Sequence, residues 1–180
     1  MGRGRWCRGG RDAGATVVSE IPVYRAPMRS RDDLVPAGAA VERALLLGVC
    51  GLGGRLDSAP ERLRDALVAV DLRHGERMAR QVERFAAAPD GALVWTRDVD
   101  GLFWLGALDG PWRFDSSPGA HEVDLMHIRS CRWLATPMPA ALVPPGVEVA
   151  FARGGRNWQR IRDVDAATAS VELQRRLANY

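Results

Sequence analysis

The sequence predicts an α+β protein built on a small, curved, mostly antiparallel β-barrel with flanking helices. Two strand-like runs, residues 92–97 and 102–108, flank a turn at residues 98–101, which is the pattern of a β-hairpin. A second turn signal, at residues 109–111, ends the second run, as expected of a tight meander. Amphipathic segments before and after these strands predict helices that cover the sheet.

The length and hydrophobic content of the chain predict one domain. The 180 residues, 47% of them hydrophobic, are enough to bury a single core. We expect residues 32–163 to form this domain and residues 164–180 to add a C-terminal helix. Residues 1–31 are rich in Arg and Gly, so we expect a disordered tail there. Met28 offers an internal start, and we interpret the tail as the product of a start codon placed too early; a nucleic-acid-binding arm is the alternative.

The positive charge of the chain belongs to this tail. The whole chain carries a formal charge of +3, and residues 1–31 hold seven Arg against two acids, a balance of 7 − 2 = +5. The remaining residues hold 18 Arg against 20 acids, which gives −2. The domain therefore has no overall attraction to nucleic acid, and contact with DNA or RNA would need a local basic patch.

The cysteines and the apolar runs indicate the compartment. Cys7, Cys50 and Cys131 lie far apart without a CxxC pair, and their odd number is typical of a reducing compartment. We therefore expect no metal site. The apolar runs are shorter than the about 18 residues of a membrane span, and residues 1–13 lack the apolar region of a secretion signal. The sequence thus predicts a cytoplasmic protein without a membrane partner.

The first element expected in the domain is a buried strand, residues 43–50, which leaves through the glycine cluster at residues 51–54. Glycine allows a ligand to approach the main chain closely, so this cluster is a candidate contact. It lacks the features of a nucleotide loop, since Arg55 follows where a phosphate loop has Lys. We therefore expect no cofactor.

Two helices are expected next. Ser58 and Glu61 have the spacing of a capping box, which predicts the start of the first helix. The second helix places Met78, Val82 and Phe85 on one apolar face, and its charged residues predict that the other face meets solvent.

A long strand with a bulge is expected over residues 122–134. Alternation places His127, Arg129 and Cys131 on one face, among apolar neighbours. These polar groups need partners, which are either a ligand or loop carbonyls and acids such as Asp115. Four residues of strand separate Cys131 from His127 by roughly 13 Å, too far for a catalytic pair. With no catalytic motif in the chain, the sequence leaves enzymatic activity open but favours a binding protein.

The C-terminal part holds a basic segment between a short helix, residues 147–151, and a terminal helix, residues 166–177. Arg153 and Arg156 precede Trp158 in this segment, and such an arrangement suits a nucleic-acid backbone with a stacked base. The alternative is a helix that packs Trp158 into the core.

Several short motifs together resemble a known family. They comprise Leu105, Gly106, Gly110, Trp112 and Phe114 in one segment and His127, Arg129 and Trp133 in the next strand. Over residues 42–162 the chain resembles the PUA-like modules, which include the EVE and YTH domains. It resembles most the N-terminal modules of Mrr-like, modification-dependent restriction enzymes. Ala92 departs from the pattern, in which an Asp usually stands there.

The resemblance implies a non-catalytic barrel with an aromatic pocket for a flipped, modified base. The ligand-binding residues that it implies are Trp95, Trp104, Trp112, Asp115, His127 and Trp133. The residues that it implies for the nucleic-acid backbone are Arg113, Arg129, Arg153 and Arg156. No effector domain accompanies the module in this sequence, so such a reader would act through an effector protein. The alternative is a small-molecule or protein-interaction module on the same barrel, without nucleic acid.

Overall fold

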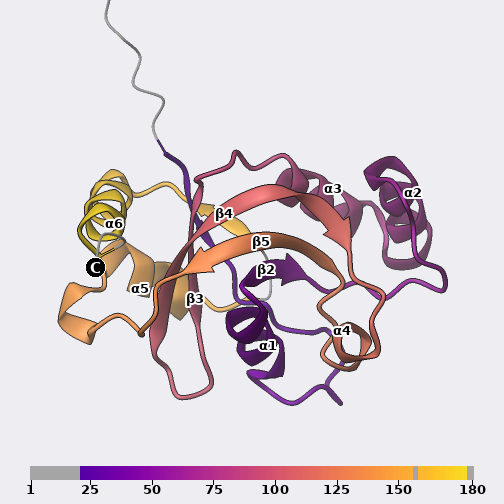
Figure 1. Ribbon diagram of the computed structural model, residues 1–180, viewed down its shortest axis with the longest axis horizontal. Helices are drawn as coiled ribbons and strands as arrows, with labels where there is room; N and C mark the ends of the chain where they lie inside the picture. The colour runs from indigo at the N-terminus through magenta and orange to yellow at the C-terminus, as the bar shows by residue number, and fades with distance from the viewer. Residues whose placement is uncertain (1–20, 156–157, 178–180) are drawn as a thin grey trace, which may run out of the picture.

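The computed structural model describes residues 21–155 and 158–177, and these form one six-stranded sheet flanked by helices (Figure 1). The strands are β1 (Val23–Arg25), β2 (Val49–Leu52), β3 (Leu93–Arg97), β4 (Phe103–Phe114), β5 (His127–Trp133) and β6 (Gln159–Ile161). The helices are α1 (Ala39–Leu47), α2 (Leu63–His74), α3 (Glu76–Ala86), α4 (Pro118–Glu122), α5 (Pro145–Ala152) and α6 (Val164–Leu177), with a 3-10 turn at Ala140–Leu142. None of the helices in these ranges is long and apolar enough to cross a membrane.

The strand order is β2-β5-β4-β3-β1-β6, and only the β1–β3 pair is parallel. The predicted α+β class and the mostly antiparallel sheet are therefore confirmed. The closed barrel is not, because closure would require the edge strands β2 and β6 to pair with each other. They lie at opposite ends of the strand order, so the described sheet is curved but open.

Strand β1 corrects the prediction of a tail that is disordered through residue 31. Val23 is fully buried, and β1 pairs with β3 on one side and with β6 on the other. Tyr24 stacks on Trp158 with ring centroids 4.4 Å apart, so Trp158 packs inward as the alternative expected, but it precedes strand β6 and the helix expected there is wrong. A chain that started at Met28 would lack this strand. Residues 1–20 of the predicted tail lie outside the described residues.

The predicted strand at residues 43–50 is wrong in most of its length. Helix α1 covers residues 39–47 and buries Ala40, Val41 and Ala44, which have helical spacing. Gly48, at φ 63°, ends the helix in the left-handed conformation, and β2 follows at once. The predicted capping box is also wrong, because α2 begins at Leu63 and its N-cap, Arg62, caps no backbone N–H through its side chain.

The predicted turn at residues 109–111 is a bulge inside a strand. Strand β4 continues through it, and its register against β5 shifts between Asp109 and Arg113. Gly110 adopts φ 67° there, which explains why glycine and proline next to each other looked like a turn signal. The predicted β3–β4 hairpin, α3, α5 and α6 are confirmed, whereas β5 begins only at His127, after the short helix α4.

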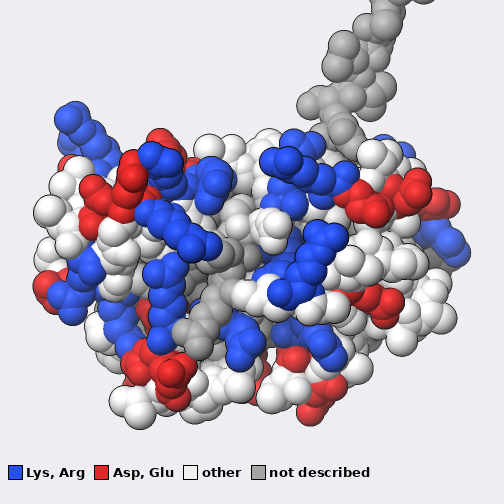
Figure 2. Space-filling model, turned by 180° about the vertical axis from the view of Figure 1, so that it is seen from behind, with Lys and Arg blue, Asp and Glu red and all other residues white. Residues whose placement is uncertain are grey.

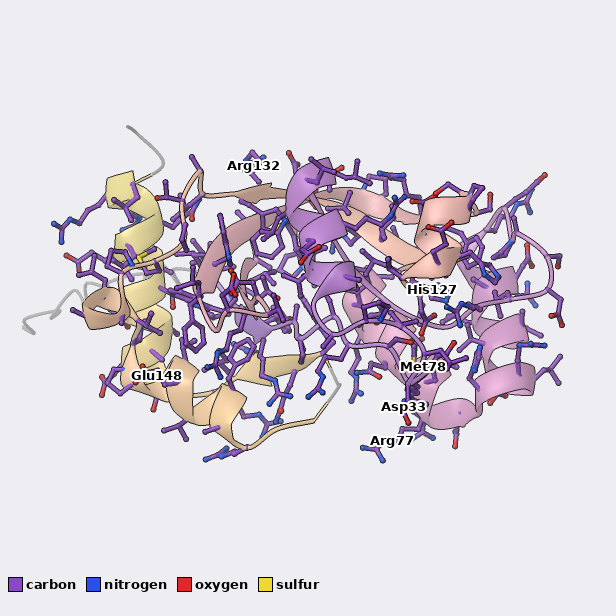
Figure 3. The ribbon with its side chains drawn as sticks, turned by 90° about the horizontal axis from the view of Figure 1, so that it is seen from below. Asp33, Arg77, Met78, His127, Arg132 and Glu148 are labelled. Carbon is purple, nitrogen blue, oxygen red and sulfur yellow. The ribbon has the colours of Figure 1, made fainter. Side chains whose placement is uncertain are left out.

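The sheet carries two hydrophobic cores at its two ends. Helices α2 and α3 lie at one end of the molecule and α5 and α6 at the other (Figure 1). Val70, Val82 and Phe85 belong to the first core, together with side chains of β2 and β5. Trp95 and Leu105 belong to the second core, which α5 and α6 complete. Figure 3 shows Met78 and His127 at the α2–α3 end, far from Glu148 on α5.

A buried arginine joins the first core to the sheet. Arg129 on β5 is 2% exposed, and each nitrogen of its guanidinium donates a hydrogen bond. The acceptors are the carbonyls of Phe85 and Ala88 at the end of α3, the Gly110 carbonyl in the bulge of β4, and the Asp90 carboxylate. A cation at the C-terminus of a helix also interacts favourably with the helix dipole. Arg129 therefore fixes the end of α3 against β4 and β5.

We predict that a chain beginning at residue 28 does not fold, whereas a chain beginning at residue 21 does. The shorter chain loses β1 and exposes the edges of β3 and β6 that β1 pairs with. Circular dichroism and thermal unfolding of both chains would test this. A chain from Met28 with the melting temperature of the full protein would contradict the structural role of β1.

We predict that Arg129→Met lowers the free energy of unfolding by about 3 kcal/mol or more, because it leaves buried carbonyls without donors. The matched control is Arg132→Met, on the same strand, where the arginine and its partner Asp109 are both exposed. That change should cost less than about 1 kcal/mol. Urea unfolding of the two variants checks the difference, and equal losses would contradict it.

Candidate functional site

The tryptophans of the predicted aromatic pocket do not converge. Trp95 is 0% exposed, and its ring N–H donates to the Ser170 hydroxyl at 2.9 Å. It therefore cannot stack on a ligand, and its assignment as a ligand contact is wrong. Trp104 donates to the Asp98 carboxylate at 2.8 Å, within the β3–β4 hairpin.

Trp133 has a structural role at the junction of β4, β5 and β2. Its ring N–H donates to the Val49 carbonyl at 2.9 Å. Gly106 makes room for the ring, since a Cβ at that position would lie 2.6 Å from it. Trp133 thus packs against the main chain of neighbouring strands and is half-buried.

Two of the predicted ligand contacts, Trp112 and His127, do meet, in the interior. Their rings are stacked with centroids 5.9 Å apart, and the Phe114 ring meets the imidazole edge-on at 5.2 Å. His127 is fully buried, and burial lowers its pKa to about 4, so the ring is neutral at pH 7. Its Nε2 lies 3.3 Å from the Gly54 carbonyl, which can only accept, so Nε2 carries the proton. The ring nitrogens His127 Nδ1 and Trp112 Nε1 have no hydrogen-bond partner in the described structure.

The predicted polar contacts also have other roles. Asp115 accepts hydrogen bonds from Arg43 at 2.9 Å and from the Ser117 backbone N–H at 3.0 Å. Arg129 is buried beneath α3, so its assignment to a nucleic-acid backbone is wrong. Arg113 and Arg153 are exposed and remain accessible, and Arg156 lies outside the described residues.

Neither of the two described cysteines is an activated thiol. Cys50 and Cys131 are free and buried, and burial raises the pKa of both thiols. In the part of the chain that the structure describes, no three His, Cys, Asp or Glu side chains are grouped so that they could hold a metal ion.

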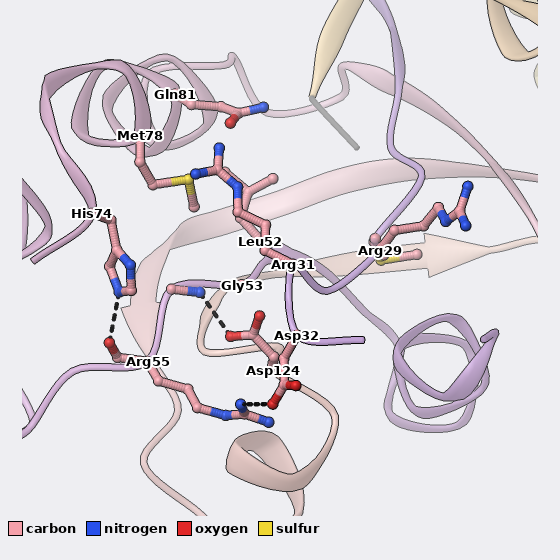
Figure 4. Close-up of a pocket in the computed structure, with 12 residues that line it drawn as sticks. Arg29, Arg31, Asp32, Leu52, Gly53, Arg55, His74, Met78, Gln81 and Asp124 are labelled. Atoms are coloured by element: carbon pink, nitrogen blue, oxygen red, sulfur yellow. Dashed lines mark hydrogen bonds and ion pairs between the residues drawn. The ribbon is translucent and has the colours of Figure 1, made fainter. Parts of the chain in front are cut away.

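A pocket of about 260 Å³ lies beside the glycine cluster, and we name it the Gln81 pocket (Figure 4). Its lining residues are Met28, Arg29, Arg31, Asp32, Leu52, Gly53, Gly54, Arg55, His74, Met78, Gln81 and Asp124. Gly54 separates it from the aromatic group, because a Cβ at Gly54 would lie 3.2 Å from His127 Nε2. The prediction that the glycine cluster could meet a ligand through its main chain is thus consistent with its position.

Three segments of the chain build the walls. His74 ends α2, and Met78 and Gln81 follow at the spacing of one helical face on α3. Gly53 and Gly54 follow β2, which pairs with β5. The segment at residues 28–32 follows β1 and forms the third wall. Since β1 and Arg129 hold two of these walls, the pocket depends on both cores of the sheet.

Asp124 connects two of the walls. Its carboxylate accepts hydrogen bonds from the Ser30 hydroxyl at 2.7 Å and from the Gly54 N–H at 2.8 Å. Gly53 must be glycine for this contact, because a Cβ there would lie 2.5 Å from Asp124 Oδ2. Met28 and Asp124 are the non-glycine residues with positive φ among the described residues, at 46° and 52°, and both line the pocket. Such conformations collect at ligand sites, where the surrounding contacts hold them.

Arg55 completes the lower wall. Its guanidinium pairs with Asp32 at 2.7 Å and donates to the His121 carbonyl at 2.7 Å. Its own carbonyl lies 2.8 Å from His74 Nε2, which therefore donates. Each of these polar groups is satisfied by the protein itself.

Three polar side chains that line the pocket, Gln81, Arg31 and Arg29, have no hydrogen bond or ion pair to the part of the chain that the structure describes. Gln81 is 4% exposed, yet its amide makes no hydrogen bond to any part of the chain that the structure describes. Arg31 is exposed and has no ion pair within the same ranges. In Figure 4 the Arg31 guanidinium extends toward Met78 and Gln81, whereas Arg29 points away from them. The pocket thus offers one amide and one cation to a ligand.

The helical periodicity of the sequence contains a signal for Gln81. Gln81 lies between Met78 and Phe85 at helical spacing, so it is a polar residue within the apolar face of α3. A polar residue in such a position requires a partner or a ligand. His74 and Arg31 carried no comparable signal, because they reach the pocket only through the tertiary fold.

Comparisons with known proteins add no assignment to this geometry. No protein-family model matches the sequence, and no curated protein matches it significantly.

We predict that protonation linked to His127 lowers the free energy of unfolding as the pH falls. The pKa of His127 is about 4 in the folded protein against 6.5 for an ordinary His, so unfolding takes up a proton between these values. The stabilisation is complete above pH 6.5 and is lost as the pH falls to about 4, by about 3 kcal/mol. Between pH 7 and pH 4, the wild type should therefore lose about 3 kcal/mol more than His127→Phe in urea unfolding. Parallel pH profiles would contradict this.

Proposed function

We propose that this protein is a non-catalytic binding module that holds a small anionic ligand in the Gln81 pocket. The observation that carries the proposal is the buried Gln81 amide, which faces the pocket without a partner. The amide is open to the pocket, so a ligand there can hydrogen-bond to it directly. A concave, mostly apolar site with a few convergent polar groups is the usual form of a small-molecule site.

The lining indicates the nature of the ligand. Met28, Leu52 and Met78 offer apolar contact to its body. Three arginines and two aspartates line the pocket, and both aspartates are engaged by protein donors. Arg31 is thus available for a phosphate or carboxylate, with which a guanidinium forms charge-assisted hydrogen bonds.

The chemistry of the lining supports binding rather than catalysis. No hydroxyl, thiol or amine side chain lines the pocket, and the His74 Nε2 proton is directed to the Arg55 carbonyl. The free thiols of Cys50 and Cys131 suit a reducing compartment, and on that ground we propose a cytoplasmic location.

A nucleic-acid reader of the PUA-like type is the second candidate. Figure 2 shows basic side chains gathered over the middle of one face, which is the local patch that such binding needs. This candidate rests on the spacing of His127, Arg129 and Trp133 in the sequence, which resembles the PUA-like motif. For a base to stack on His127, however, Trp112 would have to leave the imidazole.

The test uses 2-naphthyl phosphate, a flat apolar body with one anionic group. We predict saturable one-to-one binding that Arg31→Gln weakens about tenfold or more, the loss expected for a charged hydrogen bond. Arg84→Gln, at an exposed arginine of α3 outside the pocket lining, is the matched control and should change the affinity much less. Isothermal titration calorimetry measures both.

Equal effects of the two arginine variants would contradict the assignment of Arg31. Salt-sensitive binding of oligonucleotides, with no binding of 2-naphthyl phosphate, would favour the second candidate.

A further inference from the structure

We infer that the ligand of the Gln81 pocket is a heteroaromatic ring with a hydrogen-bond donor next to an acceptor on one edge, linked to a phosphate. Nucleoside monophosphates have this chemistry. The inference rests on the proposed function and specifies which chemical groups of the ligand the pocket recognises.

The Gln81 amide defines the polar end of the ligand. A carboxamide presents one acceptor and two donor hydrogens in a plane, so it pairs best with an edge that offers a donor beside an acceptor. Glutamine forms such paired hydrogen bonds with the adenine edge. Gln81 is held on α3 within the first core, where Val82 and Phe85 are fully buried. The helix that carries Gln81 is therefore fixed before the ligand arrives.

The walls next to Gln81 suit an aromatic ring. Two of the apolar side chains there, Met28 and Met78, carry thioether sulfurs, which make favourable contacts with aromatic rings. Gly53 and Gly54 leave the opposite wall without side chains, so a flat ring can approach the main chain. His74 Nδ1 has no partner in the described structure and adds an acceptor at the end of α2.

Arg31 lies where it could bind the phosphate of such a ligand. Arg31 extends toward Met78 and Gln81 from the segment that follows β1 (Figure 4). A ring between the methionines would thus have its edge at Gln81 and its anionic group within reach of Arg31. A pocket of about 260 Å³ is slightly smaller than most small-molecule sites, so it would hold the ring with the phosphate at the exposed Arg31, and it excludes a duplex.

The experiment compares two ligands on two glutamine variants. The ligands are 5′-AMP, which has the edge, and 2-naphthyl phosphate, which has the phosphate and a flat ring without the edge. The variants are Gln81→Leu and, as the matched control, Gln159→Leu at an exposed position on β6. Binding of both ligands is measured by isothermal titration calorimetry.

We expect the wild type to bind 5′-AMP about tenfold more tightly than 2-naphthyl phosphate. Gln81→Leu should remove this difference, and an unchanged circular dichroism spectrum shows that the variant is folded. Gln159→Leu should behave as the wild type. A 5′-phosphorylated oligoadenylate distinguishes the source: equal affinity indicates the terminal nucleotide of a strand, and weaker binding indicates the free nucleotide.

Two outcomes overturn the inference in distinguishable ways. If the wild type and Gln81→Leu bind 5′-AMP no more tightly than 2-naphthyl phosphate, the reading of the edge is wrong while the proposed function stands. If the wild type binds neither ligand, the proposed function fails and the inference fails with it.

Discussion

The buried guanidinium of Arg129 is the interaction on which this architecture depends. It satisfies carbonyls at the end of α3 and in the bulge of β4 from a single position on β5. A charge at 2% exposure is tolerated only because each nitrogen has an acceptor. The constraint reaches the pocket through α3, whose inner face carries Met78 and Gln81. Arg129 therefore holds the helix that forms one wall of the candidate site, although it does not line the pocket itself.

Some polar groups of the pocket bind protein partners and hold its walls together, whereas others make no bond to the protein. Asp124 and Arg55 join the segment after β1 to the glycine cluster and are fully engaged by protein partners. Asp124, which makes two of these contacts, and Met28, in the same lining, both adopt a left-handed conformation. The Gln81 amide, His74 Nδ1 and the Arg31 guanidinium make no hydrogen bond to the part of the chain that the structure describes. A rigid frame with a few open polar groups is the arrangement that makes binding specific.

The sequence predicts the elements that local periodicity determines, and it misses those that depend on contacts between residues remote in the chain. The β3–β4 hairpin, α3 and the inward face of β5 arise from local periodicity, and all three were predicted correctly. Strand β1 has only three residues and is specified by its pairing with β3 and β6, which are remote in the sequence. The apolar run in α1 fits a strand and a helix equally well, so its packing against the rest of the fold determines that it is a helix. The aromatic cage failed because the tryptophans found partners such as Ser170 and Val49, which no spacing reveals.

The most direct test of this account is nuclear magnetic resonance of the ¹⁵N-labelled protein during titration with 5′-AMP. The account predicts that the largest shift changes fall on the side-chain amide of Gln81 and on the backbone amides of Gly53 and Gly54. These groups lie on separate segments and meet only in the pocket. Changes confined to the exposed surface around Arg113 or Arg153, with Gln81 unmoved, would contradict a ligand site in the Gln81 pocket.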